Sequence, residues 1–380
     1  MKLHLQSIND QSIKMPVIDR RGAGGAFNYI KWDYDNCFPQ NLLELISNSP
    51  TQAAISEALF TKMAGTLIDV PETFNKPNFI DSWVDLVRKC MRDYSVFEAF
   101  SIQVVKNLDG KTYSFYHQPV SEVRLGKSEY GVNDIKKAYI CSDWKQAKTS
   151  KIKEIKMFGS ELVQPGEKYL FYFKAYMPQE VYYHTPSYYS AANWIASDGK
   201  IAKYYNNFIG NNLSTSKVIT YPQDMSEEEK SDLYNGLREN FSGEQAAGSF
   251  LLLFGDGTQA PKVESLSTPD ADLYNTLNLT IKENLITANR LSSPSLAGIS
   301  MGASMSSQAD QLIAANTMYM QNVVLPMRVF VLSKINALVT ELRGVPGAIT
   351  VEDLDLRKEF EGLTVSNDSI EEEASQNDKV

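Results

Sequence analysis

The chain has 380 residues, with 46 acidic against 37 basic side chains and a formal net charge of −9. This length allows two or three domains, or one core with sizeable insertions. The acidic balance argues against a protein that grips nucleic acid by neutralising phosphates, but it leaves open one that lets nucleic acid pass. The three cysteines are far apart and odd in number, so we predict no disulfide framework and no metal site built on them. Scattered carboxylates could still hold a metal, but nothing in the sequence points to such a site or to a cofactor.

The first residues lack the apolar segment of a signal peptide, and no apolar run in the sequence approaches the ~20 residues that a membrane span needs. We therefore expect a soluble intracellular protein. Residues 1–35 are predicted to be a flexible arm. Their glycine-rich stretch at 20–27 is not preceded by a strand, whereas a phosphate-binding loop requires one. Helical spacing then predicts two helices within residues 36–65 and a third from Asn78 to Tyr94, with Phe79 on its apolar face.

Between residues 95 and 176 the apolar period changes to two, which is typical of strands. A hairpin is predicted around a turn at residues 108–110. Further strands are predicted at residues 120–126, 135–144 and 167–176. The lysine-rich stretch from Lys145 to Lys156 is predicted to be a solvated loop or an edge. The first half of the chain is therefore predicted to be α+β.

The second half alternates long helices with short strands. A helix from Pro186 to Ile209 carries a stripe of small residues and is followed by a strand. A helix from Ser226 to Phe241 opens with a capping-box pattern and is followed by a strand that ends in a glycine turn. Another helix covers residues 270–290. A long helix from Gln308 to Arg343 contains Pro326, which we expect to kink it.

An uncharged loop, LSSPSLAGISMGASMSS at residues 291–307, joins the last two of these helices. Two helices that lead into such an element suggest a lining or a gate rather than a catalytic pocket. The loop contains GISMG, which matches the G-x-S-x-G nucleophile pattern at Ser300. That motif needs a strand before the serine and a histidine after it. All three histidines lie upstream, so a serine hydrolase is only a remote alternative.

Four basic residues on the helices before the loop are candidates for contact with phosphates: Lys200, Lys203, Lys282 and Arg290. A solvated face or ion pairs between the helices would explain them equally well. Between Asp198 and Arg290 the acids outnumber the bases by thirteen to eight, so the segment does not form a basic groove.

The order of these elements resembles the portal proteins of tailed bacteriophages. The stretches that carry the resemblance are YYNNFIGNNLSTSKVITYP from residue 204, MSEEEKSDLYNGLRENFSG, AAGSFLLLFGDGTQAPKVESLS, DADLYNTLNLTIKENLITANRLSSPSLAGI and VVLPMRVFVLSKIN. FPQNLLELISNSPTQAAISEALFTKMAG is also similar to the family's N-terminal helices. The resemblance covers most of residues 36–343, and the order of the elements carries more of it than any single motif.

The resemblance implies an α+β fold with a wing, paired stem helices, a small strand–helix–strand clip and a long kinked helix. Matching by position gives a flexible arm (1–35), the wing (36–185), stem helix 1 (186–209), the clip (210–269), stem helix 2 (270–290), the tunnel loop (291–306), the kinked wing helix (307–343) and a short acidic tail (344–380).

The resemblance also implies a structural, non-enzymatic role. Such proteins form a ring, commonly a dodecamer, that is assembled in the host cytoplasm and occupies one vertex of the capsid in the virion. The ring is the channel for DNA packaging and ejection. The implied partners are further copies of the chain, the terminase large subunit, a head–tail adaptor, the major capsid protein and double-stranded DNA that passes non-specifically, with no membrane.

Residue roles follow from the same match. In the tunnel loop, the residues expected to face DNA are Ser295, Leu296, Gly298, Ile299, Ser300, Met301, Gly302 and Ser304. In the clip, those expected to dock the motor and adaptor are Glu227, Glu228, Lys230, Arg238 and Asp256. The four bases named above become possible channel residues. One further alternative is a capsid or tail structural protein without a DNA channel.

Overall fold

The computed structural model describes residues 12–22, 27–128, 134–210, 217–221, 250–254, 262–265, 271–299, 309–344 and 347–353. Between residues 222 and 249 it describes only 226, 228, 229, 231, 232 and 235. Two helices open the folded body: α1 (Phe38–Ser47) and α2 (Pro50–Ala64). Ser49 separates them and caps α2, because its hydroxyl accepts a hydrogen bond from the Gln52 N–H. The two predicted helices are thus confirmed.

The third helix begins later than predicted. Helix α3 covers Trp83–Phe97, and Ser82 and Asp85 form a capping box at its start. Before it, the Asn78 side-chain oxygen accepts hydrogen bonds from the backbone N–H groups of Ile80 and Asp81. This turn holds the preceding residues out of the helix. Phe79, placed on a buried helix face by the sequence, is instead in this turn and is 84% exposed.

A six-stranded sheet, in the order β3-β2-β7-β6-β5-β4, packs against α3. Its strands are β2 (Ala99–Lys106), β3 (Tyr113–His117), β4 (Val123–Leu125), β5 (Lys137–Ile140), β6 (Lys153–Met157) and β7 (Lys168–Lys174). All neighbours are antiparallel except β6 and β7. The hairpin predicted around residues 108–110 is formed by β2 and β3.

The lysine-rich stretch is not only a loop or an edge, because β6 pairs on both sides within the sheet. Two of its charged side chains, Glu154 and Lys156, form ion pairs at the surface. Lys156 contacts Glu161 and Glu167 at 2.6 and 3.0 Å, and Glu154 contacts Lys137 at 2.7 Å. Sequence reasoning missed this strand because of its five residues only Ile155 is buried, which leaves almost no period-two signal.

The long C-terminal helix is interrupted. It consists of α7 (Ala309–Tyr319), the π-helical turn η7 (Met320–Val324) and α8 (Leu325–Arg343). Pro326 lies in the first turn of α8, where its missing N–H is tolerated because the wider turn before it already breaks the α-helical hydrogen-bond pattern. The sequence predicts a kink at Pro326, and the structure has a π-helical turn immediately before this residue.

This helical run is long and apolar enough to cross a membrane by length and composition alone. In the fold, however, α8 packs against α3 and α2 and buries Val331, Ile335 and Val339. The Tyr94 and Phe330 rings stack at 5.3 Å between centroids. These contacts are those of a core helix. Strand β11 (Thr350–Glu352) then returns to pair with β1 (Leu67–Asp69) just after α2.

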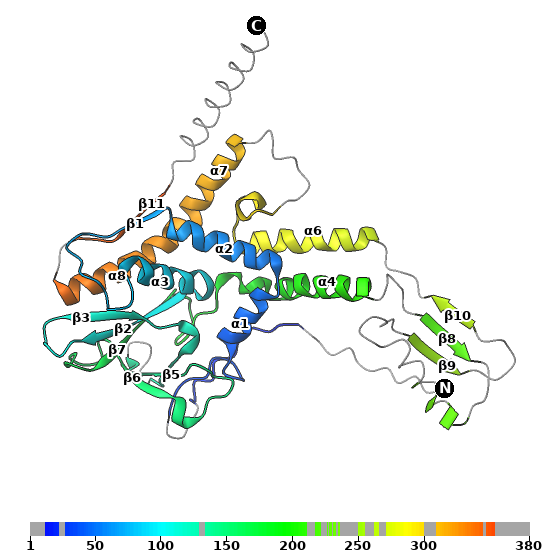
Figure 1. The fold of residues 1–380 in the computed structure, drawn as a ribbon, viewed down its shortest axis with the longest axis horizontal. Helices are drawn as coiled ribbons and strands as arrows, with labels where there is room; N and C mark the ends of the chain where they lie inside the picture. The colour runs from blue at the N-terminus through cyan, green and yellow to red at the C-terminus, as the bar shows by residue number, and fades with distance from the viewer. Residues whose placement is uncertain are drawn as a thin grey trace, which may run out of the picture.

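Two helices leave this body side by side and lead toward a small separate sheet (Figure 1). They are α4 (Ala192–Gly210), which follows the 3-10 helix η4 (Ser187–Ala191), and α6 (Ala271–Ala288). The small sheet has the order β10-β8-β9, formed by β8 (Lys217–Tyr221), β9 (Phe250–Phe254) and β10 (Lys262–Ser265). Strands β8 and β9 are parallel, and β10 is a third strand that the sequence analysis did not predict.

Candidate functional site

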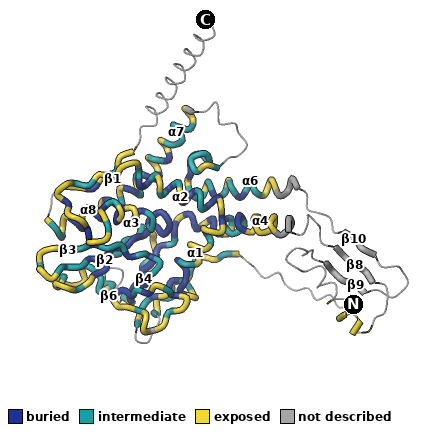
Figure 2. The backbone as a smooth tube through the Cα atoms, in the orientation of Figure 1, coloured by how far each residue is buried: buried dark blue, intermediate teal, exposed yellow. Residues whose placement is uncertain are grey.

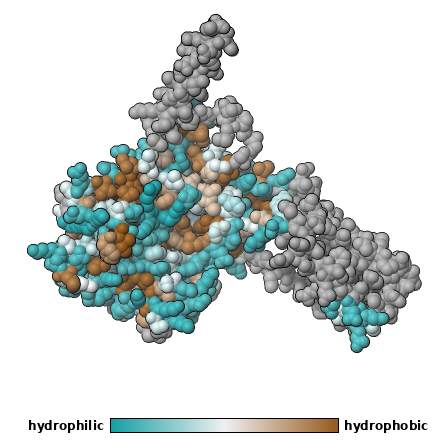
Figure 3. All heavy atoms as spheres, in the orientation of Figure 1, coloured by the Kyte–Doolittle hydropathy of each residue, from teal (hydrophilic) through white to brown (hydrophobic). Residues whose placement is uncertain are grey.

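The paired helices α4 and α6 are joined at their bases and exposed further out (Figure 2). Ile195 of α4 and Ile281 and Leu285 of α6 are fully buried. Residues 202–206 of α4 are exposed. On α6, two apolar side chains are exposed: Leu277 at 39% and Leu279 at 45%. Much of the visible surface of the body is hydrophilic by comparison, with apolar residues in separate patches (Figure 3).

Polar contacts fix α4 to the start of α2. Asp198, which is 8% exposed, accepts hydrogen bonds from the Ser49 hydroxyl at 2.6 Å and from the Thr51 N–H at 3.0 Å. The carboxylate therefore satisfies a free N–H at the positive end of a helix. Beside it, a Cβ on Gly199 would lie 2.6 Å from the Asn48 carbonyl oxygen. This glycine of the predicted small-residue stripe thus permits a close approach within its own chain.

A second polar contact fixes the end of α6 to the first turn of α2. Gln52 in α2 and Asn289 just after α6 exchange two amide hydrogen bonds, of 3.1 and 2.8 Å. The N-terminal turn of α2 therefore holds both projecting helices at once. Sequence reasoning missed this junction because its residues are 147 and 237 positions apart, and no local pattern links them.

The four predicted basic residues lie along this helix pair. Lys200 and Lys203 are exposed on α4, while Lys282 is half-buried on α6. Arg290 is exposed just after α6 with a left-handed φ of 53°. Among the described residues, none of the four has a carboxylate within salt-bridge distance. Three of the four cations are on the neighbouring helices and Arg290 follows α6; which of them face a channel stays a prediction.

The first part of the predicted tunnel loop is ordered against the body. Pro294–Ala297 forms the 3-10 helix η5, and Gly298 ends it with a φ of 69°. Leu296 and Ile299 pack partly against the core, while Ser295 is half-buried and Gly298 is exposed. The Ser292 hydroxyl donates to the Ala315 carbonyl at 2.6 Å and so connects the loop to α7. Ser300, Met301, Gly302 and Ser304 lie outside the described residues.

In the sequence, the predicted docking residues fall in the connections between β8, β9 and β10. Ser226 and Glu229 form the capping box that the sequence predicts: Glu229 accepts from the Ser226 N–H at 2.9 Å, and its own N–H donates to the Ser226 hydroxyl at 3.3 Å. Glu228 is exposed next to it. Glu227, Lys230, Arg238 and Asp256 lie outside the described residues.

A buried ionic cluster lies where the body meets the start of α4. His184, 2% exposed, faces Glu180 at 2.6 Å through Nδ1 and Glu98 at 2.8 Å through Nε2. The Ser187 hydroxyl donates to the other Glu98 oxygen. Burial opposes the charge on His184, but its hydrogen bonds to the two carboxylates outweigh burial and raise its pKa. Burial likewise opposes the charge on Glu98, but hydrogen bonds from His184 and Ser187 lower its pKa.

Both histidines that the structure describes face carboxylates. His117 faces Asp93 at 3.0 Å, and His184 is enclosed by its two glutamates. His184 is buried, whereas His117 is half-buried. In the described part of the chain, no group of three His, Cys, Asp or Glu side chains is placed to hold a metal ion.

Residues 69–363 match the family model of phage portal proteins, which is well over half of the chain. The chain therefore belongs to the phage portal protein family, whose members are structural proteins rather than enzymes. None of the curated proteins matches it. The match to the family model confirms the family expected from the sequence, and the helices and sheets described above confirm the α+β fold.

Solved structures share the fold at low sequence identity. A chain of the "Virion of native gene transfer agent (GTA) particle" has a TM-score of 0.51 and 15% identity, with 88% of each chain covered. A chain of the "Neck of native GTA particle computed with C12 symmetry" has a TM-score of 0.53 and 14% identity, with 87% of this chain and 88% of that one covered.

Proposed function

We propose that copies of this chain assemble into a closed ring, a dodecamer, at one vertex of a phage capsid, and that DNA passes through the ring during packaging and ejection. The observation that carries this proposal is the helix pair α4 and α6. Two helices project from the body with Leu277 and Leu279 39% and 45% exposed. Covering such exposed apolar side chains with a second copy of the chain removes them from water and stabilises the assembly. A ring with one repeated heterologous interface covers them in every copy.

The channel chemistry supports the same role. The segment from Asp198 to Arg290 is acidic overall, so it repels phosphates, and the uncharged loop at 291–306 makes no salt links that must break at each step of the duplex. Lys200, Lys203, Lys282 and Arg290 would give only scattered contacts with the backbone. DNA would thus pass without being held.

In this proposal the small sheet and the capped segment at Ser226 form the clip. Glu228 is exposed there, and the clip would dock the terminase large subunit and later the head–tail adaptor. The six-stranded body would be the wing and would contact the major capsid protein. The ring would be assembled in the host cytoplasm and stay in the virion.

Electron microscopy and mass photometry of the purified full chain test the proposal. We expect rings with a central hole wide enough for a duplex. Replacing Leu277 and Leu279 by glutamate is expected to leave the circular dichroism spectrum unchanged and to reduce ring formation several-fold, because charges would then have to be buried between copies. Monomers or sheets from the unmodified chain would instead favour a capsid or tail protein without a channel.

A further inference from the structure

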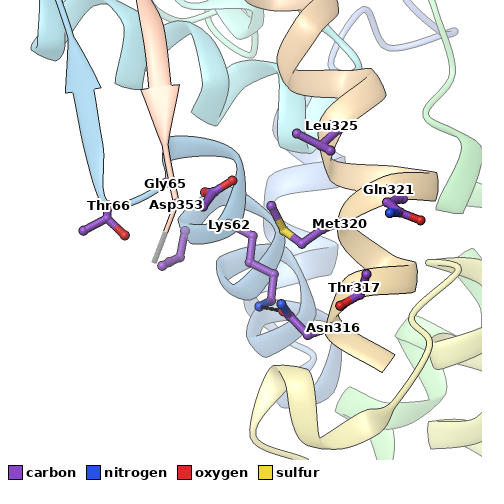
Figure 4. A pocket seen from close by; sticks show the side chains of 10 residues that line it. Lys62, Gly65, Thr66, Asn316, Thr317, Met320, Gln321, Leu325 and Asp353 are labelled. Carbon is purple, nitrogen blue, oxygen red and sulfur yellow. Dashed lines mark hydrogen bonds between the residues drawn. The ribbon is translucent and has the colours of Figure 1, made fainter. Parts of the chain in front are cut away.

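A pocket of about 470 Å³ opens beside the C-terminal end of α2 (Figure 4). Its wall is made by α2, by the end of α7 with the π-helical turn η7, and by the residue that follows β11. Lys62, Asn316, Gln321, Leu325 and Asp353 are among its lining residues. π-Helical turns are rare and occur often at functional sites. This one supplies Met320 and Gln321 to the pocket.

Of the two charged side chains that line the pocket in the described part of the chain, Asp353 has an oppositely charged partner and Lys62 does not. Asp353 is already compensated, because the buried Arg328 donates two hydrogen bonds of 2.7 Å to its carboxylate. Lys62 has no such partner. Its ammonium group donates to the Asn316 side-chain oxygen at 2.5 Å, and among the described residues no carboxylate lies within 4 Å of it. Burial lowers the pKa of Lys62, and the charge of Asp353 offsets this only in part.

An ammonium group can donate three hydrogen bonds, and within the described part of the chain Lys62 makes one, to Asn316. Neutral polar side chains also line the pocket, including Asn316, Thr317 and Gln321. A carboxylate placed in the pocket would therefore gain a charge-assisted hydrogen bond from Lys62, with amides and a hydroxyl beside it. A nucleic-acid backbone fits less well, because binding to phosphates depends on clustered bases, and among the described residues that line this pocket Lys62 is the single uncompensated cation.

We propose that this pocket binds an acidic segment of polypeptide through Lys62, and that the segment is residues 354–380 of the same chain. The chain leaves the rim of the pocket at Asp353. The 27 residues that follow contain eight acids and three bases. Because they are covalently attached beside the pocket, their local concentration there is high, on the order of millimolar. Asn316 belongs to α7, so an occupant on Lys62 would also fasten the base of α7 to α2.

The test measures how fast Lys62 reacts with an amine-specific acylating reagent, read by mass spectrometry of the full chain. A bound carboxylate covers the ammonium group and stabilises its protonated form, and both effects slow acylation. We compare the unmodified chain with a full-length variant in which Asp355, Glu359, Glu361, Glu371, Glu372 and Glu373 are replaced by the corresponding amides. Lys62 is expected to react at least several-fold faster in the variant.

Lys89 is the internal control, because it is exposed on α3 and pairs with Asp81 at 2.6 Å; its rate should not change. A synthetic peptide of residues 354–380 added to the variant should slow Lys62 again. Equal Lys62 rates in the two chains would overturn the proposal, and so would protection of the variant by a DNA duplex but not by the peptide. The readout does not depend on ring assembly, so a failed ring proposal leaves it interpretable.

Discussion

His184 holds the start of α4 to the body through a single buried ring. Its two nitrogens face Glu180 and Glu98, and Glu98 in turn accepts from the backbone and hydroxyl of Ser187, the first residue of η4. Glu98 itself has a left-handed φ of 48° at the end of α3. A non-glycine residue adopts this conformation at some cost, and the surrounding hydrogen bonds offset that cost here.

This cluster predicts a pH dependence with a definite sign. Because the folded-state pKa of His184 is raised, its contribution is complete below the ordinary value of 6.5 and is lost as the pH rises through the folded-state pKa. Because the pKa of Glu98 is lowered, its contribution is complete above 4.5 and is lost as the pH falls through the folded-state value. The cluster should therefore stabilise the fold most between about pH 4.5 and 6.5.

Chemical denaturation across this range checks the prediction. His184→Gln should lower the free energy of unfolding by about 3 kcal/mol near pH 6, because two carboxylates lose their shared cation. The loss should shrink above pH 6.5. A constant difference at every pH from 5 to 9 would show that the histidine charge does not matter.

Gly199 gives a second prediction at the residue scale. In a solvated helix, alanine is more favourable than glycine by about 1 kcal/mol. Here the added Cβ would lie 2.6 Å from the Asn48 carbonyl oxygen, so we expect Gly199→Ala to destabilise the chain by about 1–3 kcal/mol. Ala202→Gly, at an exposed position of the same helix, is the matched control and should cost about 1 kcal/mol. Thermal unfolding of both variants decides whether the close approach exists.

At the scale of elements, the first turn of α2 fixes both projecting helices. Asp198 connects it to α4, and the amide pair of Gln52 and Asn289 connects it to the end of α6. The direction of the helix pair relative to the body thus depends on a few polar contacts as well as on the apolar contact around Ile195 and Ile281.

A double-mutant cycle tests this junction. Gln52→Ala and Asn289→Ala should each destabilise the chain by about 1–3 kcal/mol, because each leaves one amide partly unpaired. The double variant should cost less than the sum of the two, with a coupling of at least about 0.5 kcal/mol. Additive losses would mean that the two amides do not act as a pair.

At the scale of the whole molecule, the described elements form a body with a helix pair that extends away from it to a small sheet (Figure 1). Such a shape leaves Leu277 and Leu279 without cover in one copy. We therefore expect the molecule to be complete only as an assembly. In that assembly, the loop at 291–306 is expected to face the channel.

Replacing Gly298 and Gly302 by valine is expected to leave ring assembly intact and to reduce DNA packaging several-fold. Gly298 has a φ of 69° with no atom within 4 Å of an added Cβ, so valine would strain the loop without creating a clash. Gly159→Val is the matched control, since that glycine has a φ of 85° and equally open surroundings elsewhere in the body. Normal packaging by the double variant would exclude a role of the loop in the channel.

The sequence alone determined the α+β class, the family and most of the long helices, because these depend on local periodicity, caps and element order. Ser226 forms the capping box with Glu229 that the pattern predicts. Tertiary structure decided what depends on distant partners. Strand β6 has almost no apolar alternation and exists because β5 and β7 pair with it. The contacts of Asp198, Asn289 and Lys62 join segments more than a hundred residues apart, and local sequence patterns carry no information about such contacts.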